Sequence, residues 1–340
     1  MSGRICAYTS FTYAYLSRAR ILVESLRLVH PEWEIWAILV DEAPPGVDVA
    51  PALAGFDGIL GVAELEIPRW RAWLFKHDVV EACTAVKGAM LVHLLELGAD
   101  KVFYFDPDIA VFNPLDDLVG RLDQHSVLLT PHQIAANGTV SAVRDNEITS
   151  LQYGSFNLGF VGVRNNREGM AFARWWAAQL YRECYDEVGD GIFTDQKYCD
   201  LVPALFGGVH VVRDPGCNVA SWNLSRRELR FDAAGGLVVN GSALKFYHFT
   251  KIGGAGDVMT ERYGVRNIEV FEVWHWYKRR EMARRVAGMP AGWWAYGVFA
   301  DGGAIAKELR VAWRGREAAM ARVDDPFALG EAGVWEAVGG

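Results

Sequence analysis

Apolar residues near the start of the chain follow two spacings that predict different elements. Short apolar runs at 5–7 and 34–40 have the length of buried strands, and the stretch 17–29 carries one apolar stripe at helical spacing. A strand, a helix and a strand at this spacing form a βαβ unit, in which the two strands pair in parallel. The chain therefore begins with a predicted Rossmann-like half-sheet, and residues 8–13 form the loop after its first strand.

The alternation of strands and helices continues to about Gly264. A helical stretch at 78–97 leads into a strand at 101–105, and a second one at 167–185 is rich in aromatic residues. Further strands are expected near 59 and at 127–130, 156–163, 209–212 and 243–249, and a further helix opens at 194–197 with Thr194 or Asp195 as its cap.

Two of these stretches have unusual composition. Small residues alternate along the strand at 156–163, which indicates that another group approaches its backbone closely. The polar stretch 131–154 lacks periodicity and predicts a long loop. Loops of that length are usually functional lids or disordered segments.

The strand at 101–105 ends in Asp106-Pro107-Asp108, where two acids flank a proline. Pro107 has no N–H for a sheet ladder and restricts the residue before it, so the strand should stop here. Acids at the carboxyl end of a buried strand lie where open α/β sheets bind ligands, and hard divalent cations prefer oxygen ligands. An isolated pattern of this kind is more often a simple turn, so other residues have to support a metal site.

Composition and charge exclude several classes of protein. Of the 340 residues, 51% are hydrophobic and 22% are charged, which is enough apolar material for a sizeable core. The net charge of −8 argues against a general nucleic-acid binder, and no G-x-G-x-x-G follows the first strand as in dinucleotide-binding proteins. Five cysteines without a C-x-x-C pair indicate a reducing compartment. With no signal-peptide pattern and no apolar run of about 20 residues, a cytoplasmic protein is expected.

Short motifs occur along the chain in an order and at spacings that resemble one known family. They are Tyr15-Leu16, Glu24-Ser25-Leu26, His30-Pro31, the run 101–108, Phe156-Asn157-Leu158-Gly159, Asp195-Gln196 and Tyr247-His248-Phe249. Over roughly residues 5–255 the chain resembles the nucleotide-sugar glycosyltransferases of GT-A fold, most closely the retaining ones of the glycosyltransferase family 8 type. The resemblance implies an α/β, Rossmann-like fold with a mixed, mostly parallel sheet flanked by helices and a helical C-terminal extension. A catalytic domain is expected at 1–264, with a helical, basic and aromatic region at 265–340 packed on or near it.

The resemblance also implies a metal cofactor. Asp106, Asp108 and His248 match the family's ligands of a catalytic Mn²⁺ or Mg²⁺, and diphosphate oxygens of the donor complete the shell. Imidazole as a ligand favours Mn²⁺, because Mg²⁺ prefers an all-oxygen shell. A lone histidine on a strand is otherwise more often structural, so the role of His248 rests on the family order.

Three residues match positions that surround the donor sugar in the family. Asn157 and Asp195 would hold the sugar, with Asp195 orienting its hydroxyls, and Gln196 would lie nearest the reacting carbon. Because glutamine is a poor nucleophile, the resemblance favours a front-face mechanism, in which the leaving phosphate deprotonates the acceptor hydroxyl. That mechanism requires no dedicated general base.

The donor, expected to be a UDP-sugar, would have further contacts that follow from the resemblance. Tyr15 matches a tyrosine that stacks on the base, and Lys87 stands in place of a donor-contacting arginine. Further donor contacts are expected from Tyr8, Thr9 and Ser10 of the first loop, from Asp106, and from Lys251. The chain departs from the family in two places: the acids of the first loop are absent, which leaves the base unassigned, and so is the late His-x-x-Gly-x-x-Lys-Pro-Trp motif.

The region between Trp274 and Glu317 has two interpretations. It holds nine Lys/Arg and four acids among many aromatic residues. This pattern fits a helix that lies on an anionic membrane surface. It fits equally a helical cap that buries its aromatic residues on the catalytic domain and leaves its basic residues in solvent.

The expected function is transfer of a hexose from a nucleotide-diphosphate sugar to a glycan, lipid-linked or protein acceptor, with retention. The acceptor would contact the 131–155 loop and Trp222-Asn223. One alternative is a sugar-phosphate nucleotidyltransferase, but that enzyme needs a glycine-rich loop with a lysine, and residues 8–13 contain no glycine. The other alternative is a non-catalytic sugar-binding protein that retains the fold.

Overall fold

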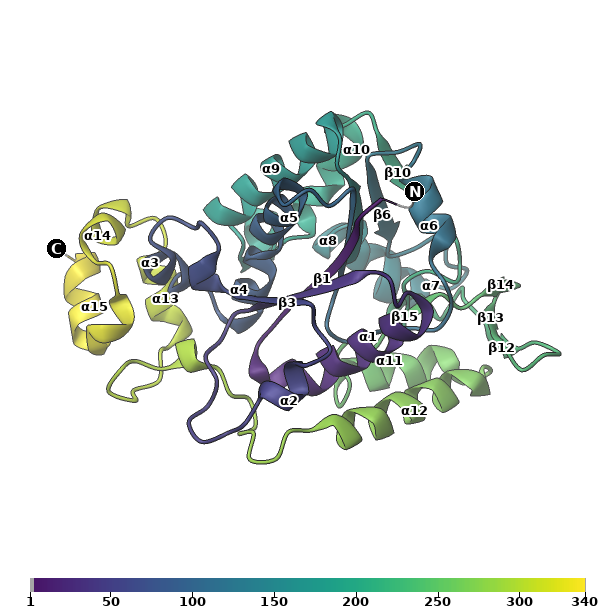
Figure 1. The fold of residues 1–340 in the computed structure, drawn as a ribbon. Helices are drawn as coiled ribbons and strands as arrows, with labels where there is room; N and C mark the ends of the chain where they lie inside the picture. Colours follow the sequence, from purple (N-terminus) through teal and green to yellow (C-terminus); the bar gives the residue numbers. More distant parts are fainter. Residues whose placement is uncertain (1–2, 340) are drawn as a thin grey trace.

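A computed structural model of the chain describes residues 3–339, with a seven-stranded sheet at its centre (Figure 1). The strand order is β10-β6-β7-β4-β1-β2-β3. β7 runs antiparallel to its neighbours β4 and β6, whereas the other four neighbouring pairs are parallel. The bounds are β1 Ile5–Phe11, β2 Glu34–Leu39, β3 Gly58–Gly61, β4 Lys101–Phe105, β6 Val127–Pro131, β7 Phe156–Arg164 and β10 Val209–Val211. The predicted class, a mixed and mostly parallel sheet, is confirmed.

Helices cover both faces of this sheet. Side chains alternate between the faces along a strand. On β4, Val102 and Tyr104 pack with residues of α4, α5 and α9, whereas Phe103 and Phe105 pack with residues of α1 on the other face. Helix α12 lies against the outer side of α1 (Figure 1). The bounds of these helices are α1 Leu16–Val29, α4 Val79–Ala85, α5 Lys87–Glu96, α9 Arg167–Arg182 and α12 Ile268–Arg284.

After β4 the chain continues into a second sheet, which has three strands. Its order is β11 (Val219–Ala220), β15 (Phe246–His248) and β5 (Ile109–Val111). The predicted stop at Pro107 is confirmed, since β4 ends at Phe105 and β5 begins in the other sheet. β15 pairs antiparallel with β5 so that His248 is opposite Ile109. This register brings His248 next to the Asp106-Pro107-Asp108 turn, although about 140 residues separate them in the sequence.

The remaining elements are short. A third sheet holds β12 (Leu229–Phe231), β13 (Leu237–Val239) and β14 (Ser242–Ala243), and β8 (Asp186–Glu187) pairs with β9 (Ile192–Phe193). The other helices are α2 Ala50–Leu53, α3 Trp70–Leu74, α6 Asp116–Arg121, α7 Val140–Ala142, α8 Thr149–Tyr153, α10 Val202–Leu205, α11 Ala255–Gly264, α13 Lys307–Trp313, α14 Glu317–Arg322 and α15 Gly330–Gly339. One-turn 3₁₀ helices include Tyr13–Tyr15 and Ser221–Asn223, and a longer one is Lys197–Leu201.

Three predicted connections differ from the structure. The polar stretch 131–154 is not one structureless loop, because α7, a π-helix at Val143–Ile148 and α8 fill most of it. The single helix expected at 78–97 is two helices that meet at Val86. Just before this break the hydroxyl of Thr84 donates to the carbonyls of Val80 and Glu81, a contact that bends helices. The stretch after Gln196 is a 3₁₀ helix, and neither Thr194 nor Asp195 caps it.

The first strand is also longer than predicted. Residues 8–11 continue β1 and pair with β2 as far as Phe11 opposite Leu39. The prediction that Tyr8, Thr9 and Ser10 lie in a loop is therefore wrong. β4 pairs with β1 only as far as Tyr8, and Thr9 and Ser10 stay in the sheet through their pairing with Ala37 and Ile38 of β2.

The C-terminal region buries its aromatic residues against the rest of the chain. Trp274, Tyr277, Tyr296, Phe299 and Trp313 are buried. The indole of Trp313 donates to the carbonyl of Ala72, and that of Trp294 donates to the carbonyl of Val40. The structure thus favours the helical cap over the membrane helix for these aromatic residues. Among residues 3–339, no helix is both long and apolar enough to cross a bilayer.

Candidate metal and donor site

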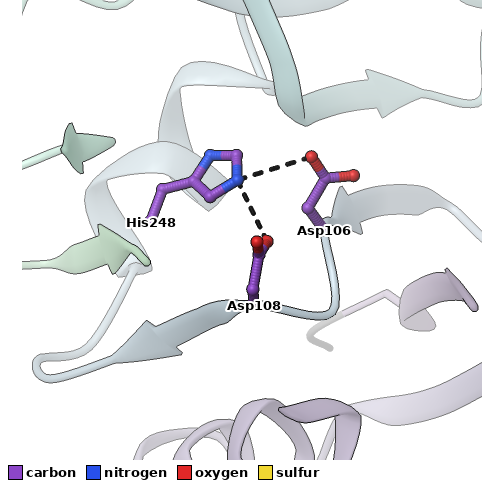
Figure 2. A group of neighbouring side chains, drawn as sticks. All are labelled: Asp106, Asp108 and His248. Atoms are coloured by element: carbon purple, nitrogen blue, oxygen red, sulfur yellow. Dashed lines mark ion pairs between the residues drawn. The ribbon is translucent and has the colours of Figure 1, made fainter. Parts of the chain in front are cut away.

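Two carboxylates and an imidazole converge where β4 ends and β15 ends. The Nε2 atom of His248 lies 3.0 Å from Oδ1 of Asp108 and 3.6 Å from Oδ2 of Asp106 (Figure 2). One ligand atom from each of the three residues lies within 4.8 Å of the others. Within the described chain this is the group of His, Cys, Asp and Glu side chains that is arranged to hold a metal ion.

The Asp106-Pro107-Asp108 segment is a tight turn as well as part of this cluster. The Asp106 N–H donates to the carbonyl of Gly159, and the Ile109 N–H donates back to the carbonyl of Asp106. The turn brings both carboxylates toward His248, as Figure 2 shows. The simple-turn interpretation and the metal-site interpretation of this segment are therefore compatible.

The orientation of His248 is fixed by its other ring nitrogen. Nδ1 lies 3.2 Å from Oδ1 of Asn157, and that oxygen also accepts from the Gly159 N–H and from Nδ2 of Asn218. Since Oδ1 of Asn157 can only accept, Nδ1 of His248 carries the proton and donates. Nε2 is then directed at the two carboxylates. A metal-binding histidine is typically held through its second nitrogen in this way.

A glycine makes room for the His248 ring. A Cβ on Gly159 would lie 2.5 Å from Cε1 of His248, closer than real side chains approach. At Gly162, two residues along β7, a Cβ would lie 2.9 Å from the Phe103 ring. The close approach predicted from the small residues of this strand is confirmed, and at Gly159 the approaching group is His248.

Asp106 is held by a buried lysine and a tyrosine. Oδ1 of Asp106 accepts from the Tyr104 hydroxyl at 2.6 Å and from Nζ of Lys87 at 3.0 Å. Lys87 also pairs with Oδ2 of Asp195 at 2.8 Å and donates to the Leu158 carbonyl at 3.2 Å. Only 2% of Lys87 is exposed, so it is not the solvated helix residue that its type usually predicts. Burial lowers the pKa of Lys87, but the two carboxylates outweigh burial and raise it above its ordinary value.

Burial and charge act in opposite directions on the cluster. Burial lowers the pKa of His248, and the neighbouring Asp108 outweighs it, so the pKa is raised. Burial raises the pKa of Asp108, and His248 outweighs it, so the pKa is lowered. Burial also raises the pKa of Asp195, and here the nearby Lys87 only partly offsets the effect. Both shifts in pKa favour the charged forms of His248 and Asp108 when they face each other.

The chemistry of this donor set fits a divalent transition metal. Two carboxylate oxygens and one neutral imidazole nitrogen suit Mn²⁺ better than Mg²⁺, which prefers oxygen. Asp106 and Asp108 supply the negative charge that a dication needs, and Nε2 of His248 faces them.

The other residues predicted to contact the donor differ in how they are connected to the cluster of Asp106, Asp108 and His248. Asn157 and Asp195 are joined to it through His248 and Lys87 respectively. Gln196 follows Asp195 and donates from Nε2 to the carbonyl of Tyr153, which links it to the helical segment before β7. Lys251 is exposed in the turn after β15, in a left-handed conformation with φ of 51°.

The residues predicted to bind the nucleotide differ in exposure: Tyr15 is partly exposed, whereas the three residues of β1 are buried. Tyr15 is 42% exposed, and the Arg18 guanidinium lies 4.6 Å from the centre of its ring. Tyr8, Thr9 and Ser10 are buried. The Tyr8 hydroxyl donates to the Lys87 carbonyl, and the Ser10 hydroxyl donates to the Cys83 carbonyl. These two side chains pack β1 against the α4–α5 junction.

Sequence reasoning missed three residues of the site, Tyr104, Arg18 and Asn218, and it assigned a fourth, Trp222, to the acceptor and not to the support of His248. Tyr104 is two positions before Asp106 and so lies on the same face of β4, a relation that the strand period could have revealed. Arg18 is one helical turn beyond Tyr15, but nothing in the sequence marks it. Asn218 supports Asn157, and the Trp222 ring packs edge-on against His248 at 5.2 Å between centroids. Both of these come from the loop around β11, and no local pattern indicates their contacts.

Comparisons with curated proteins give weak matches. No family model matches the sequence. The chain is 26% identical over 254 residues to the uncharacterized protein YfnF of Bacillus subtilis (strain 168), a match that covers 74% of this chain and 82% of YfnF. It is 28% identical over 178 residues to the uncharacterized protein YfnD of the same organism. That match covers 50% of this chain and about half (53%) of YfnD.

Solved structures with a similar arrangement are glycosyltransferases. The galactosyltransferase LgtC, in complex with donor and acceptor sugar analogs, gives a TM-score of 0.47 at 14% identity and covers 85% of this chain and 98% of LgtC. The apo form of mouse xyloside xylosyltransferase 1 gives 0.42 at 14% identity, with 74% and 98% covered. The apo bifunctional enzyme WbbM gives 0.41 at 13% identity, with 66% and 41% covered. TM-scores below 0.5 carry no argument about the activity of this chain.

Proposed function

We propose that this chain is a metal-dependent glycosyltransferase of the GT-A type. It moves a hexose from a nucleotide-diphosphate sugar, a UDP-sugar by the resemblance, to a carbohydrate, lipid-linked or protein acceptor. The observation that carries this proposal is the convergence of Asp106, Asp108 and Nε2 of His248 at the carboxyl end of β4. The same corner connects to Asn157 and Asp195, which the resemblance assigns to the donor sugar.

Each residue at and around the cluster of Asp106, Asp108 and His248 has a defined role under this proposal. Asp106, Asp108 and His248 hold Mn²⁺ or Mg²⁺, and Asn157 keeps His248 in the tautomer that leaves Nε2 free. The bound ion supplies Lewis-acid stabilisation of the negative charge on the departing diphosphate. Tyr15 stacks on the base from its exposed position, with Arg18 behind the ring. Lys251, exposed in the turn that follows β15, contacts a phosphate of the donor under this proposal.

Retention at the anomeric carbon is part of the proposal. Gln196 donates its amide N–H to the Tyr153 carbonyl, so its Oε1 atom is the group left to face a sugar. An amide oxygen stabilises positive charge on a sugar ring but is a poor nucleophile. This supports a front-face reaction in which the leaving phosphate takes the proton of the acceptor hydroxyl. A product with inverted anomeric configuration, detected by proton NMR, would remove this role from Gln196.

The residues proposed to bind the acceptor are chosen because they lie near the metal and donor site. The helical segment 140–153 and the Trp222-Asn223 turn lie next to the corner, through the Gln196–Tyr153 hydrogen bond and the Trp222–His248 ring contact. An acceptor bound against these two segments would lie near the carbon that Gln196 is proposed to face. For location we propose the cytoplasm, with contact to an anionic membrane surface through 274–317 as the less favoured alternative, since the aromatic residues there are buried.

The test is hydrolysis and binding of a panel of UDP-, GDP- and dTDP-sugars with Mn²⁺ or with EDTA. We expect one sugar nucleotide to be hydrolysed with Mn²⁺, to raise the melting temperature of the protein, and to lose both effects in EDTA. If no sugar nucleotide binds or turns over, the enzyme assignment is wrong. Binding without turnover would favour the non-catalytic sugar-binding alternative. Formation of a sugar phosphate and a nucleoside triphosphate when pyrophosphate is added would favour the nucleotidyltransferase.

A further inference from the structure

The two oxygens of Asp106 have different surroundings. Oδ1 accepts from the Tyr104 hydroxyl at 2.6 Å and from Nζ of Lys87 at 3.0 Å, whereas Oδ2 faces Nε2 of His248 at 3.6 Å. We propose that Lys87 and Tyr104 are positioning residues that let Asp106 offer one oxygen to a metal ion and thereby select against Ca²⁺. This inference rests on the metal dependence proposed above.

Lys87 is held inside the protein and is only 2% exposed. Its Nζ atom donates hydrogen bonds to Oδ1 of Asp106 and to the Leu158 carbonyl, and it forms an ion pair with Oδ2 of Asp195 at 2.8 Å without hydrogen-bond geometry. It also lies 4.2 Å from the centre of the Tyr104 ring. Removing Lys87 alone would leave the buried Asp195 carboxylate unpaired, which is costly. Lys87 therefore acts through Asp106 and Asp195, a role that differs from the donor contact implied by the resemblance.

Binding through one oxygen separates small from large divalent ions. Ca²⁺ takes about six to eight oxygen ligands and often uses both oxygens of a carboxylate, whereas Mg²⁺ and similar small ions take a compact octahedron. For Asp106 to bind Ca²⁺ with both oxygens, Oδ1 would have to leave Lys87 and Tyr104. The nitrogen ligand from His248 further favours Mn²⁺ over Ca²⁺.

A second effect of Lys87 must be separated from this one. Its positive charge lies close to the cluster and weakens the binding of every dication by electrostatic repulsion. Because Mn²⁺ and Ca²⁺ carry the same charge, this repulsion cancels in the ratio of their dissociation constants. The ratio of Kd for Ca²⁺ to Kd for Mn²⁺ therefore reports how Asp106 is held and not how much charge surrounds it.

The experiment is calorimetric titration of each metal, without nucleotide, into the full chain and three variants. Tyr104→Phe removes one hydrogen bond to Oδ1 and leaves every charge in place. Lys87→Met combined with Asp195→Asn removes the lysine without leaving the buried Asp195 carboxylate unpaired. Lys101→Met is the matched control, because Lys101 lies on the same strand and pairs with Asp123, away from the cluster. Thermal melting confirms that each variant is folded.

We expect the ratio to fall about fivefold in Tyr104→Phe, since a hydrogen bond to a charged group is involved, and about tenfold or more in the double variant. It should not change in Lys101→Met. Equal changes in both dissociation constants, with an unchanged ratio, would overturn the inference while leaving the metal site intact. If the original chain binds neither ion, alone or with UDP present to supply diphosphate oxygens, the proposed metal dependence itself fails. If the double variant does not fold, Tyr104→Phe decides the question.

Discussion

Strands β4 and β1 are neighbours in the central sheet, and their carboxyl ends differ in structure. β4 stops at Phe105, and the turn at Pro107 passes the chain to the second sheet. β1 continues to Phe11, whose ring stacks on Phe56. The end of β4 presents two carboxylates beside an imidazole, whereas the end of β1 is buried in an apolar cluster and is followed by one half-exposed ring, Tyr15.

This difference indicates that the carboxyl ends of β4 and β1 have different roles in the proposed donor site. Charge concentrates at β4, where Asp106, Asp108, Asp195, Lys87 and His248 are in mutual contact or share a partner. At β1 the hydroxyls of Tyr8 and Ser10 hold the sheet to the α4–α5 junction, and the hydroxyl of Thr9 is buried without a hydrogen-bond partner. We infer that one end supplies metal and sugar chemistry and the other supplies a stacking surface for the base.

The largest effect should come from Asp108→Ala, which tests the β4 end directly. Removing this carboxylate leaves His248 without its closest partner and the ion without one ligand. We expect the rate of donor hydrolysis to fall by at least about 100-fold, the scale for losing one charge-stabilising group. The measurement is turnover with Mn²⁺, with Asp123→Ala on the exposed surface as the control. A variant that keeps more than a tenth of the activity would contradict the assignment.

Gly159→Ala tests the same end through packing. The added Cβ would lie 2.5 Å from Cε1 of His248 and 2.8 Å from Oδ1 of Asn157, so the ring must move. We expect Mn²⁺ affinity to fall by about 10- to 100-fold, as for other losses of support to a metal ligand. Gly120→Ala is the control, because a Cβ there meets nothing within 4 Å. Unchanged Mn²⁺ affinity in Gly159→Ala would show that His248 is not a ligand.

The two strand ends also differ in how far the sequence predicts them. At β4 the proline is a covalent reason for the strand to stop, so Asp106 and Asp108 could be placed from the sequence alone. Residues 8–11 contain no such signal, and the pairing of β1 with β2, which continues to Phe11 beyond the end of its pairing with β4, decides where β1 ends. Local chemistry therefore predicted one end, and tertiary pairing determined the other.

The same reasoning explains which parts of the site were missed. His248 was predicted from motif order, but its support from Asn157, Gly159 and Asn218 depends on the register of β15 against β5 and on contacts across β7. Lys87 was identified, yet its burial and its link to Asp195 could not be inferred from a helical pattern. Contacts between residues distant in sequence are fixed by sheet order, which the sequence only partly specifies.

Tyr15→Ala tests the stacking surface at the β1 end. Stacking of a base on an aromatic ring contributes about 1–3 kcal/mol, so the KM for the donor should rise about tenfold with little change in kcat. Tyr15→Phe is the matched control, since it keeps the ring and the contact with the Arg18 guanidinium. The comparison of the two strand ends fails if Tyr15→Ala and Tyr15→Phe give the same KM as the original chain.

The smallest effect is expected from Tyr8→Phe, which separates packing from binding in β1. The Tyr8 hydroxyl donates to the Lys87 carbonyl in the protein interior, so its loss should cost about 1 kcal/mol in the free energy of unfolding. The KM for the donor should stay within about twofold, because the buried hydroxyl has no access to a nucleotide. Chemical denaturation measures the first quantity and steady-state kinetics the second, with Tyr181→Phe on the surface as the control. A large rise in KM at unchanged stability would return Tyr8 to the nucleotide site, and the β1 end would then bind the donor through its strand as well as through Tyr15.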